Sequence, residues 1–417
     1  MAIGDRPWGG ADPAELLAKV DEADCLAVLS RMARQKSYSE TDGERVMVMM
    51  MAEEMRALGL ETELTPVPGD RINAVGRWRG TGGGKSLLFN GHVDTNPATE
   101  GWTVDPWGGK VDDDFIYGIG VSNMKAGDAA YLCAVKTLIG AGITLPGDVI
   151  LTYVVGELQG GIGTIALMEQ GLRADYFVNS EPTDLQLLTM HAGTFTFVIE
   201  LFGNTRHLSK REAAVDAVAA ACDLVPRLNA MTFPDPPTPE HARINRVHVG
   251  VLLGALGRDL VEWRPPQVAD YARIKGSGRY APGQTEESAL AAIRAELDAL
   301  EARFPGLKAT LEPERLKGRP SMPNFEVPPD SPVLAAVNRA YERVRGTAQP
   351  TGIFLPPGFF GTDAAHLLRV GGIEGVVCGP GGRYNTMPDE RVDIVDYIDM
   401  VKIYMLTILE ICSQQRT

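Results

Sequence analysis

The chain has 417 residues, more than one ordinary domain needs, so two domains are expected. A formal net charge of −14 argues against nucleic acid and against an anionic membrane surface as partners. The hydrophobic fraction of 44% is ordinary for a globular protein, and no apolar run reaches the length of about eighteen residues that a transmembrane helix needs. Residues 1–13 lack the apolar core of a secretory signal, and the five cysteines include no C-x-x-C pair. Free thiols and a cytoplasmic location are therefore expected.

The first part of the chain alternates strand-like and helix-like segments. Thr41 and Glu44 have the spacing of a capping box, which predicts a helix running to Gly59. Strands are predicted at residues 61–67, 72–78, 86–90, 148–155 and 175–179, and helices at residues 123–140 and 162–170. This alternation predicts an α/β domain with a mostly parallel sheet flanked by helices.

The pattern changes after about residue 190, where long helices accompany a few strands. Strands are predicted at residues 194–202, 246–253 and 308–312, and helices at residues 209–228 and 286–304. The proline-rich segment 315–329 marks a return to the first domain, with helices at 330–344 and 392–412 and a strand at 375–378. The sequence thus predicts one domain from residues 1–190 and 315–417, and an inserted α+β domain from residues 191–314.

The apolar run at residues 87–89 leads to a histidine and an aspartate two positions apart, His92 and Asp94. On an extended chain, side chains at i and i+2 point the same way. His92 could bind a metal ion while Asp94 holds the imidazole from behind. The alternative is a structural histidine at a strand end, and the later motifs decide against it.

Five motifs follow one another along the chain. They are Asn90-Gly91-His92-Val93-Asp94-Thr95, Tyr117-Gly118-Ile119-Gly120-Val121-Ser122-Asn123-Met124-Lys125, Gly156-Glu157-Leu158-Gln159-Gly160-Gly161-Ile162-Gly163-Thr164, Ser180-Glu181-Pro182-Thr183, and Gly379-Pro380-Gly381-Gly382 with Pro388-Asp389-Glu390. Together they resemble the metallopeptidase family of aminoacylase, acetylornithine deacetylase, succinyl-diaminopimelate desuccinylase and carboxypeptidase G. The resemblance covers nearly the whole chain. It implies that the first domain is catalytic and binds metal, and that the insertion is a dimerisation domain.

The resemblance also implies a metal site, with a departure from the family pattern. Members typically bind two zinc-like ions, and this chain keeps the ligands His92 and Glu181 of the first site. Three other ligand positions of the family hold different residues here. Asn123 stands in place of the aspartate that bridges the two ions, Leu158 in place of a glutamate of the second site, and Asn385 in place of a late histidine. Leucine cannot ligate a metal, and an amide binds a zinc-like ion weakly. One divalent transition metal ion, of the manganese or zinc class, is therefore expected on His92, Glu181 and Asn123.

The position of the family's general base is kept as Glu157. Its carboxylate could take a proton from the attacking water and pass it to the leaving nitrogen. The alternative is a solvated glutamate at a strand end. The resemblance gives His207 a role in the partner subunit's site, where it would stabilise an oxyanion. The resemblance also implies that Arg279 binds a carboxylate of the substrate. For both, an ordinary surface side chain is the alternative.

The family hydrolyses C–N bonds in small carboxylates, so a small-molecule carboxylate substrate and a homodimer or larger homo-oligomer are expected. Phe359, Phe360 and Tyr384 could form a slot for a flat ring beside Asn385, although core packing explains such aromatics equally well. The most specific hypothesis is an aminohydrolase that replaces an aromatic amine with hydroxyl and releases ammonia, as in deamination of 5-nitroanthranilate. The alternatives are an amidase or peptidase acting on N-acyl amino acids or dipeptides, and a metal-depleted binding protein without catalysis.

Overall fold

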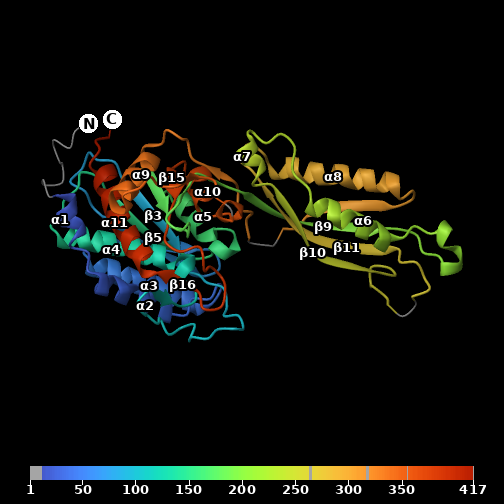
Figure 1. Cartoon of the computed structure of the whole chain (residues 1–417), viewed down its shortest axis with the longest axis horizontal. Helices are drawn as coiled ribbons and strands as arrows, with labels where there is room; N and C mark the ends of the chain where they lie inside the picture. Colours follow the sequence, from blue (N-terminus) through green and yellow to red (C-terminus); the bar gives the residue numbers. More distant parts are fainter. Residues whose placement is uncertain (1–11, 263–264, 316–318, 355, 417) are drawn as a thin grey trace. The chain divides into compact units, whose positions relative to one another are not determined.

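The computed structural model describes residues 12–262, 265–315, 319–354 and 356–416. The chain forms two compact units (Figure 1). The first contains Met1–Met190, Glu326–Pro357 and Thr362–Thr417, and the second contains His191–Phe325 and Gly358–Gly361. The short strands β8 (Met190–His191) and β13 (Phe325–Glu326) lie where the chain passes between the units.

The first unit is built on an eight-stranded sheet. Its strands, in spatial order, are β1 (Glu61–Val67), β2 (Arg71–Trp78), β5 (Val149–Val154), β3 (Leu87–His92), β6 (Tyr176–Asn179), β15 (Glu374–Val377), β7 (Leu187–Leu188) and β14 (Thr351–Gly352). The central strands β5, β3, β6 and β15 are parallel, while β1, β2 and β5 pair antiparallel. Every residue of β3, β5 and β6 is buried, as expected for strands covered on both faces. The predicted fold class is confirmed.

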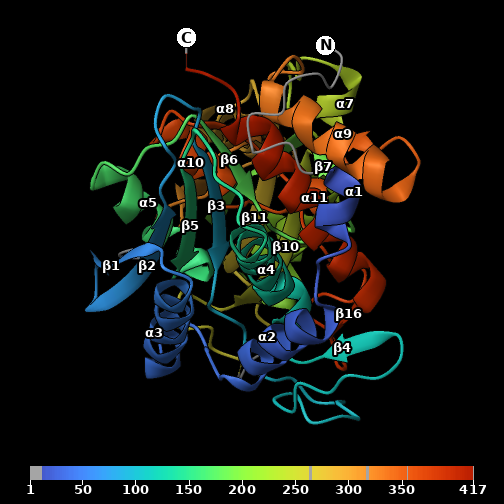
Figure 2. The same cartoon turned by 90° about the vertical axis from the view of Figure 1, so that its left-hand side faces the viewer.

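Helices cover both faces of this sheet. Figure 2 shows α4 (Ala126–Gly140) and α11 (Ile394–Cys412) on one side of β3 and β5, and α5 (Ile162–Glu169) on the other. Further elements of this unit are α1 (Pro13–Leu17), α2 (Glu22–Arg34), α3 (Asp42–Ala57), α9 (Pro332–Arg345), α10 (Ala364–Arg369), and the pair β4 (Phe115–Tyr117) and β16 (Arg391–Asp393).

The second unit has a four-stranded antiparallel sheet with two helices on one face (Figure 1). The strand order is β10 (Arg246–Ala255), β11 (Tyr271–Tyr280), β9 (Gly193–Phe202) and β12 (Lys308–Pro313). Alternate residues of β9, such as Phe197 and Ile199, pack beneath α6 (Ala217–Asn229) and α8 (Glu286–Arg303). The short helix α7 (Pro239–Ala242) completes this α+β unit.

The sequence did not predict β11, although it lies in the middle of this sheet. Its glycines Gly276 and Gly278 weaken the strand pattern. Each glycine lies against an aromatic ring of β9. A Cβ atom added at Gly276 would come 2.4 Å from the ring of Phe197, and one added at Gly278 would come 2.3 Å from the ring of Phe195. The rings occupy the space that side chains on β11 would need, so the strand depends on contacts that local sequence does not reveal.

Three local predictions are wrong in detail. The predicted helix at 209–228 is two segments, η3 (Leu208–Ala213) and α6, because the side chain of Asp216 caps α6 at the amide of Ala219. The predicted capping box is not formed, since Thr41 donates to the carbonyl of Tyr38 instead of capping α3. The helix expected at 123–140 begins as α4 only at Ala126, after the irregular segment η1 (Val121–Lys125).

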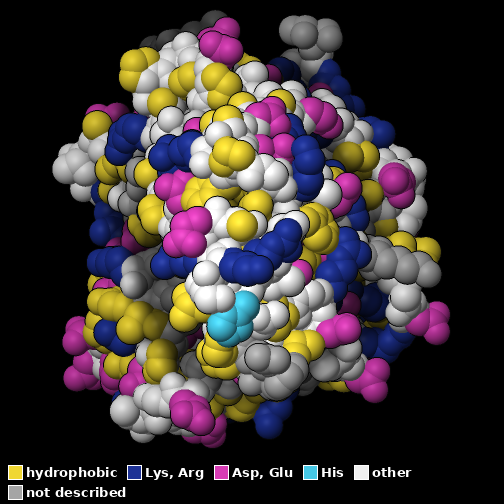
Figure 3. All heavy atoms as spheres, turned by 90° about the vertical axis from the view of Figure 1, so that its right-hand side faces the viewer, with side chains coloured by type: hydrophobic (Ala, Val, Ile, Leu, Met, Phe, Trp, Pro, Cys, Tyr) yellow, Lys and Arg dark blue, Asp and Glu magenta, His cyan; other side chains and the backbone are white. Residues whose placement is uncertain are grey.

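Within the part of the chain that the structure describes, no helix is both long and apolar enough to cross a membrane. On the face drawn in Figure 3, basic and acidic side chains alternate with hydrophobic ones, without one continuous basic surface.

Candidate active site

The parallel strands of the first unit bring three site residues to one edge of the sheet. His92 is the last residue of β3, Glu157 begins the short helix η2 (Glu157–Gln159) after β5, and Glu181 follows β6. Strand β3 pairs with both β5 and β6. Because the carboxyl ends of neighbouring parallel strands meet at the same edge, the three side chains converge there.

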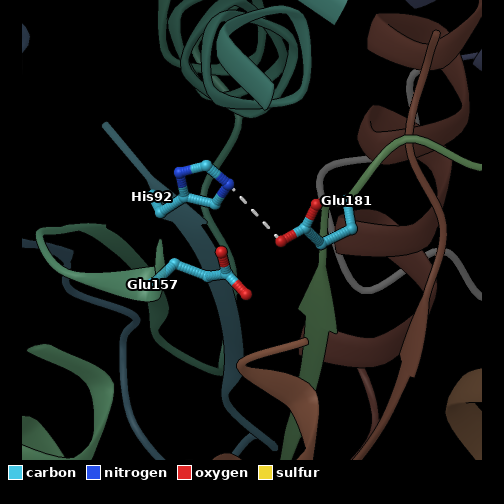
Figure 4. A group of neighbouring side chains, drawn as sticks. All are labelled: His92, Glu157 and Glu181. Carbon is cyan, nitrogen blue, oxygen red and sulfur yellow. Dashed lines mark ion pairs between the residues drawn. The ribbon is translucent and has the colours of Figure 1, made fainter. Parts of the chain in front are cut away.

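Figure 4 shows the two carboxylates beside the imidazole of His92. Nε2 of His92 lies 3.6 Å from Oε1 of Glu181, and ligand atoms of His92, Glu157 and Glu181 all lie within 4.8 Å of one another. Oδ1 of Asn123 lies 3.2 Å from the same Nε2. An imidazole, a carboxylate and an amide oxygen near one another are donors that fit a divalent transition metal ion, and Glu157 lies beside them.

Asn123 is held through its backbone by a carboxylate that sequence reasoning missed. The amides of Ser122 and Asn123 donate to Oε1 of Glu390 at 2.9 and 3.0 Å. Glu390 is buried, and burial raises its pKa to about 7 although these backbone donors lower it. Glu390 is the last residue of the Pro388-Asp389-Glu390 motif, so this motif was the signal in the sequence that could have identified it.

Asp94 contacts His92 differently from the prediction. The nearest partner of the His92 Nδ1 is the backbone carbonyl of Asp94 at 2.9 Å, while the carboxylate is 3.5 Å away. The carboxylate instead accepts hydrogen bonds from the amides of Gly156, Glu157 and Leu158 at 2.9, 3.3 and 3.2 Å. Burial alone would raise the pKa of Asp94, but the imidazole and the backbone donors lower it, so the group is a carboxylate that fixes the loop carrying Glu157.

Glu157 has the electrostatic surroundings of a proton acceptor. Burial raises the pKa of Glu157 well above its ordinary value; His92 opposes the shift, and Glu181 and Asp363 reinforce it. A carboxylate with a raised pKa binds a proton more strongly, as general-base catalysis near neutral pH requires.

Asp363 is a further buried carboxylate near Glu157, and the sequence analysis did not assign it to the site. It is 1% exposed, and its Oδ2 accepts a hydrogen bond from the hydroxyl of Thr164 at 2.8 Å. Burial raises its pKa to about 7. Asp363 lies three residues after the aromatic pair Phe359 and Phe360, so a carboxylate next to a predicted binding segment was the signal that could have identified it.

A pocket of about 280 Å³ opens beside the candidate metal ligands His92 and Asn123. Its lining includes His92 and Asn123 together with the apolar side chains of Trp102, Leu158 and Met387. Leu158, which stands where the family has a metal-binding glutamate, thus forms part of the pocket wall.

Two further predicted residues of the first unit, Asn385 and Tyr384, make other contacts. Oδ1 of Asn385 accepts a hydrogen bond from the hydroxyl of Ser122. Tyr384 is absent from the pocket lining; its ring packs 5.8 Å from Phe115, and Arg391 lies 3.8 Å from its centroid. The remaining four predicted residues belong to the second unit: His207, Arg279, Phe359 and Phe360. His207 is exposed, and its Nδ1 lies 3.0 Å from the Ser209 hydroxyl.

Comparison with known proteins agrees with this geometry. The family model described as "Peptidase family M20/M25/M40" matches residues 88–410, a span that contains every candidate metal ligand. The chain belongs to this family. It is a hydrolase acting on C–N bonds, as the family's known members are.

Individual relatives cover most of the chain. The N-formyl-4-amino-5-aminomethyl-2-methylpyrimidine deformylase of Bacillus subtilis is 28% identical over 381 residues, 84% of this chain and 85% of that protein. The acetylornithine deacetylase of Photorhabdus laumondii is 24% identical over 88% of this chain and 92% of its own. Among solved structures, aminopeptidase PepT from Bacillus cereus is similar with a TM-score of 0.76 at 18% identity, covering 94% of this chain and 99% of that one.

Proposed function

We propose that this protein hydrolyses the amide bond of a small N-acyl compound with one divalent metal ion and Glu157 as general base. The observation that carries the proposal is the convergence of His92, Glu157 and Glu181 within 4.8 Å at one sheet edge. Asn123 completes the donor set through Oδ1. Decay to a binding protein has no physical reason to retain both the base and the candidate ligands beside it.

The chain's own residues divide the reaction between them. A divalent ion of the manganese or zinc class on His92, Glu181 and Asn123 would supply a Lewis acid that polarises the bond under attack. Glu157 takes a proton from water as the water oxygen bonds to the acyl carbon. Glu157 then gives a proton to the nitrogen as the C–N bond breaks, which yields a carboxylic acid and an amine. Asp94 keeps Glu157 in place through the loop amides.

The relatives support an acyl group of small size. The names of the Bacillus subtilis and Photorhabdus proteins describe removal of a formyl and an acetyl group. A pocket of about 280 Å³ is also small for a binding site, which suits a compact substrate better than a long peptide.

A second candidate is hydrolysis of an aromatic amine, with 5-nitroanthranilate as the model substrate. Trp102, Leu158 and Met387 in the pocket favour it, because a flat ring packs well against such apolar walls. The ring slot predicted from Phe359, Phe360 and Tyr384 does not support it, since Tyr384 packs against Phe115 instead of lining the pocket.

Product analysis separates the two candidates. The metal-loaded protein is incubated with N-formyl and N-acetyl amines and, separately, with nitro-substituted aminobenzoates. Release of formate or acetate supports the amidase, while ammonia with a hydroxylated ring supports the aminohydrolase. If neither series is turned over faster than by the Glu157→Gln variant, both proposed substrate classes are wrong.

We also propose that the second unit mediates dimerisation. Its strand β10 is an edge of the sheet and exposes three consecutive apolar residues, Val251, Leu252 and Leu253, each about 40% exposed. An exposed apolar edge strand readily pairs with another strand, and a second copy would cover it in a symmetric dimer.

A further inference from the structure

The loop that carries Glu157 is held through the side chain of Gln159. Gln159 is the last residue of η2, is 5% exposed and uses both ends of its amide. Its Oε1 accepts a hydrogen bond from Nη1 of Arg71 at 3.1 Å, and its Nε2 donates to the hydroxyl of Ser39. A buried amide with a partner at each end has a fixed orientation, so η2 is held at its last residue.

Arg71 reaches this loop because of the strand register. Strand β2 pairs antiparallel with β5, with Ala74 opposite Tyr153, so the start of β2 lies beside the chain that leaves β5. The guanidinium group packs against Gly156, where an added Cβ atom would come 3.0 Å from Nη1. Nη2 of Arg71 donates to Glu44 of α3, a carboxylate that is 2% exposed. Helix α3 therefore fixes the guanidinium group, and the guanidinium group fixes η2.

Ser39 connects these contacts to Asp94. The hydroxyl of Ser39 donates to Oδ2 of Asp94 at 3.0 Å, and the carboxylate of Asp94 holds the amides of residues 156–158. The short helix η2 is thus attached at its beginning through backbone amides and at its end through Gln159. Attachment at both ends restricts the backbone from which the side chain of Glu157 projects.

We propose that Gln159 and Arg71 are positioning residues that keep the carboxylate of Glu157 beside the candidate metal ligands. The inference rests on the proposed role of Glu157 as general base. A misplacement of about 1 Å in a reacting group lowers a rate by on the order of a hundredfold, so the attachment of η2 matters for proton transfer. The alternative is a purely structural role, in which Arg71 balances the buried charge of Glu44 and Gln159 fills the space beside it.

The first measurement follows the loop itself and needs no turnover. Hydrogen–deuterium exchange of the amides of residues 156–161 is compared in the wild type and in Gln159→Leu, which keeps an apolar side chain of similar length and removes both hydrogen bonds. We expect these amides to exchange about tenfold faster in the variant. Arg77→Gln is the matched control, since Arg77 lies on the same strand as Arg71 but pairs at 2.9 Å with Asp148, which precedes β5. It should leave the exchange unchanged.

The second measurement separates positioning from a structural role. With Glu157 present, Gln159→Leu should lower kcat by on the order of tenfold to a hundredfold, while KM and metal content stay near their wild-type values. Added to Glu157→Gln, the same substitution should lower the residual kcat no further, because no base is left to position. A substitution that only loosens the fold would lower kcat by the same factor in both backgrounds.

A second variant keeps the test decisive if Gln159→Leu does not fold. Glu44→Gln combined with Arg71→Met removes the ion pair as a whole, so no unpaired charge remains buried, and it should show the same faster exchange and the same loss of kcat. Unchanged exchange, unchanged kcat, or a further loss on top of Glu157→Gln would overturn the inference and leave the role of Glu157 standing. Wild-type activity in Glu157→Gln alone would overturn the proposed function, and this inference with it.

Discussion

At the scale of single residues, Glu157 is half-buried and lies beside the candidate metal ligands. Replacing it with Gln keeps the shape and removes the proton acceptor. We expect Glu157→Gln to lower kcat by on the order of a hundredfold to ten-thousandfold while metal content and thermal stability stay near wild type. Steady-state kinetics and metal analysis check this.

Glu169→Gln provides the control, since Glu169 is exposed at the end of α5. That variant should keep the activity of the wild type. If Glu157→Gln did the same, the base would have to be another group, and Asp363 is the buried carboxylate to examine next.

The ligand set also predicts metal stoichiometry. Leu158 and the amide of Asn385 cannot rebuild a second site, so we expect close to one divalent ion per chain after excess manganese or zinc is removed. With Glu181 as the one carboxylate in the set, a chelator should strip the ion and the activity quickly, and added metal should restore both. Elemental analysis and activity after dialysis measure this.

A variant that restores charge sharpens the test. Asn123→Asp adds a second carboxylate and should slow metal loss to a chelator, whereas Asn385→Gln should not. Two tightly held ions in the wild type, or loss over days, would contradict the expectation.

At the scale of elements, α10 is joined to the loop after β5 by His366. Its Nε2 donates to the carbonyl of Gly160 at 2.9 Å, and burial lowers its pKa from 6.5 to about 4. The imidazole of His366 therefore takes up a proton below about pH 6.5 in the unfolded chain, but only near pH 4 in the folded protein. This contribution to stability is complete above pH 6.5 and is lost as the pH falls from 6.5 to 4.

We expect the free energy of unfolding to fall by up to about 1.4 kcal/mol per pH unit in this window through His366. Urea denaturation between pH 7 and pH 4 measures the slope. His366→Gln can still donate a hydrogen bond but cannot titrate, so its slope should be smaller. Identical slopes in the two proteins would show that His366 does not couple stability to pH.

At the scale of the whole molecule, the proposed dimer makes a prediction about His207. If each chain lends His207 to the other's site, His207→Ala and Glu157→Gln should each be inactive alone. Co-expressed as a mixed dimer they should regain part of the activity, because one of the two composite sites holds both wild-type residues.

Activity of purified mixed dimers, carrying a different tag on each chain, measures this recovery. A co-expressed pair of His207→Ala and Glu169→Gln is the reference, since Glu169→Gln leaves Glu157 intact on both chains. A fully active monomer, or a mixed dimer that recovers nothing, would show that His207 does not act across subunits.

What the sequence alone determined follows from short-range patterns. Alternating apolar runs predicted the parallel strands, since a buried strand needs apolar side chains on both faces. Motifs at strand ends then predicted His92, Glu157 and Glu181, and the structure brings these three together because the ends of neighbouring parallel strands share one edge. The roles assigned to His207 and Arg279 rest on motif alone and stay predictions.

What only the tertiary structure decided depends on residues far apart in the chain. The amides of residues 122 and 123 donate to Glu390, more than 260 positions away along the chain. The strand β11 was hidden because its glycines rely on aromatic rings of β9. Local sequence records periodicity and propensity, whereas burial, charge compensation and hydrogen-bond partners arise from packing between distant segments, and these set the chemistry of the site.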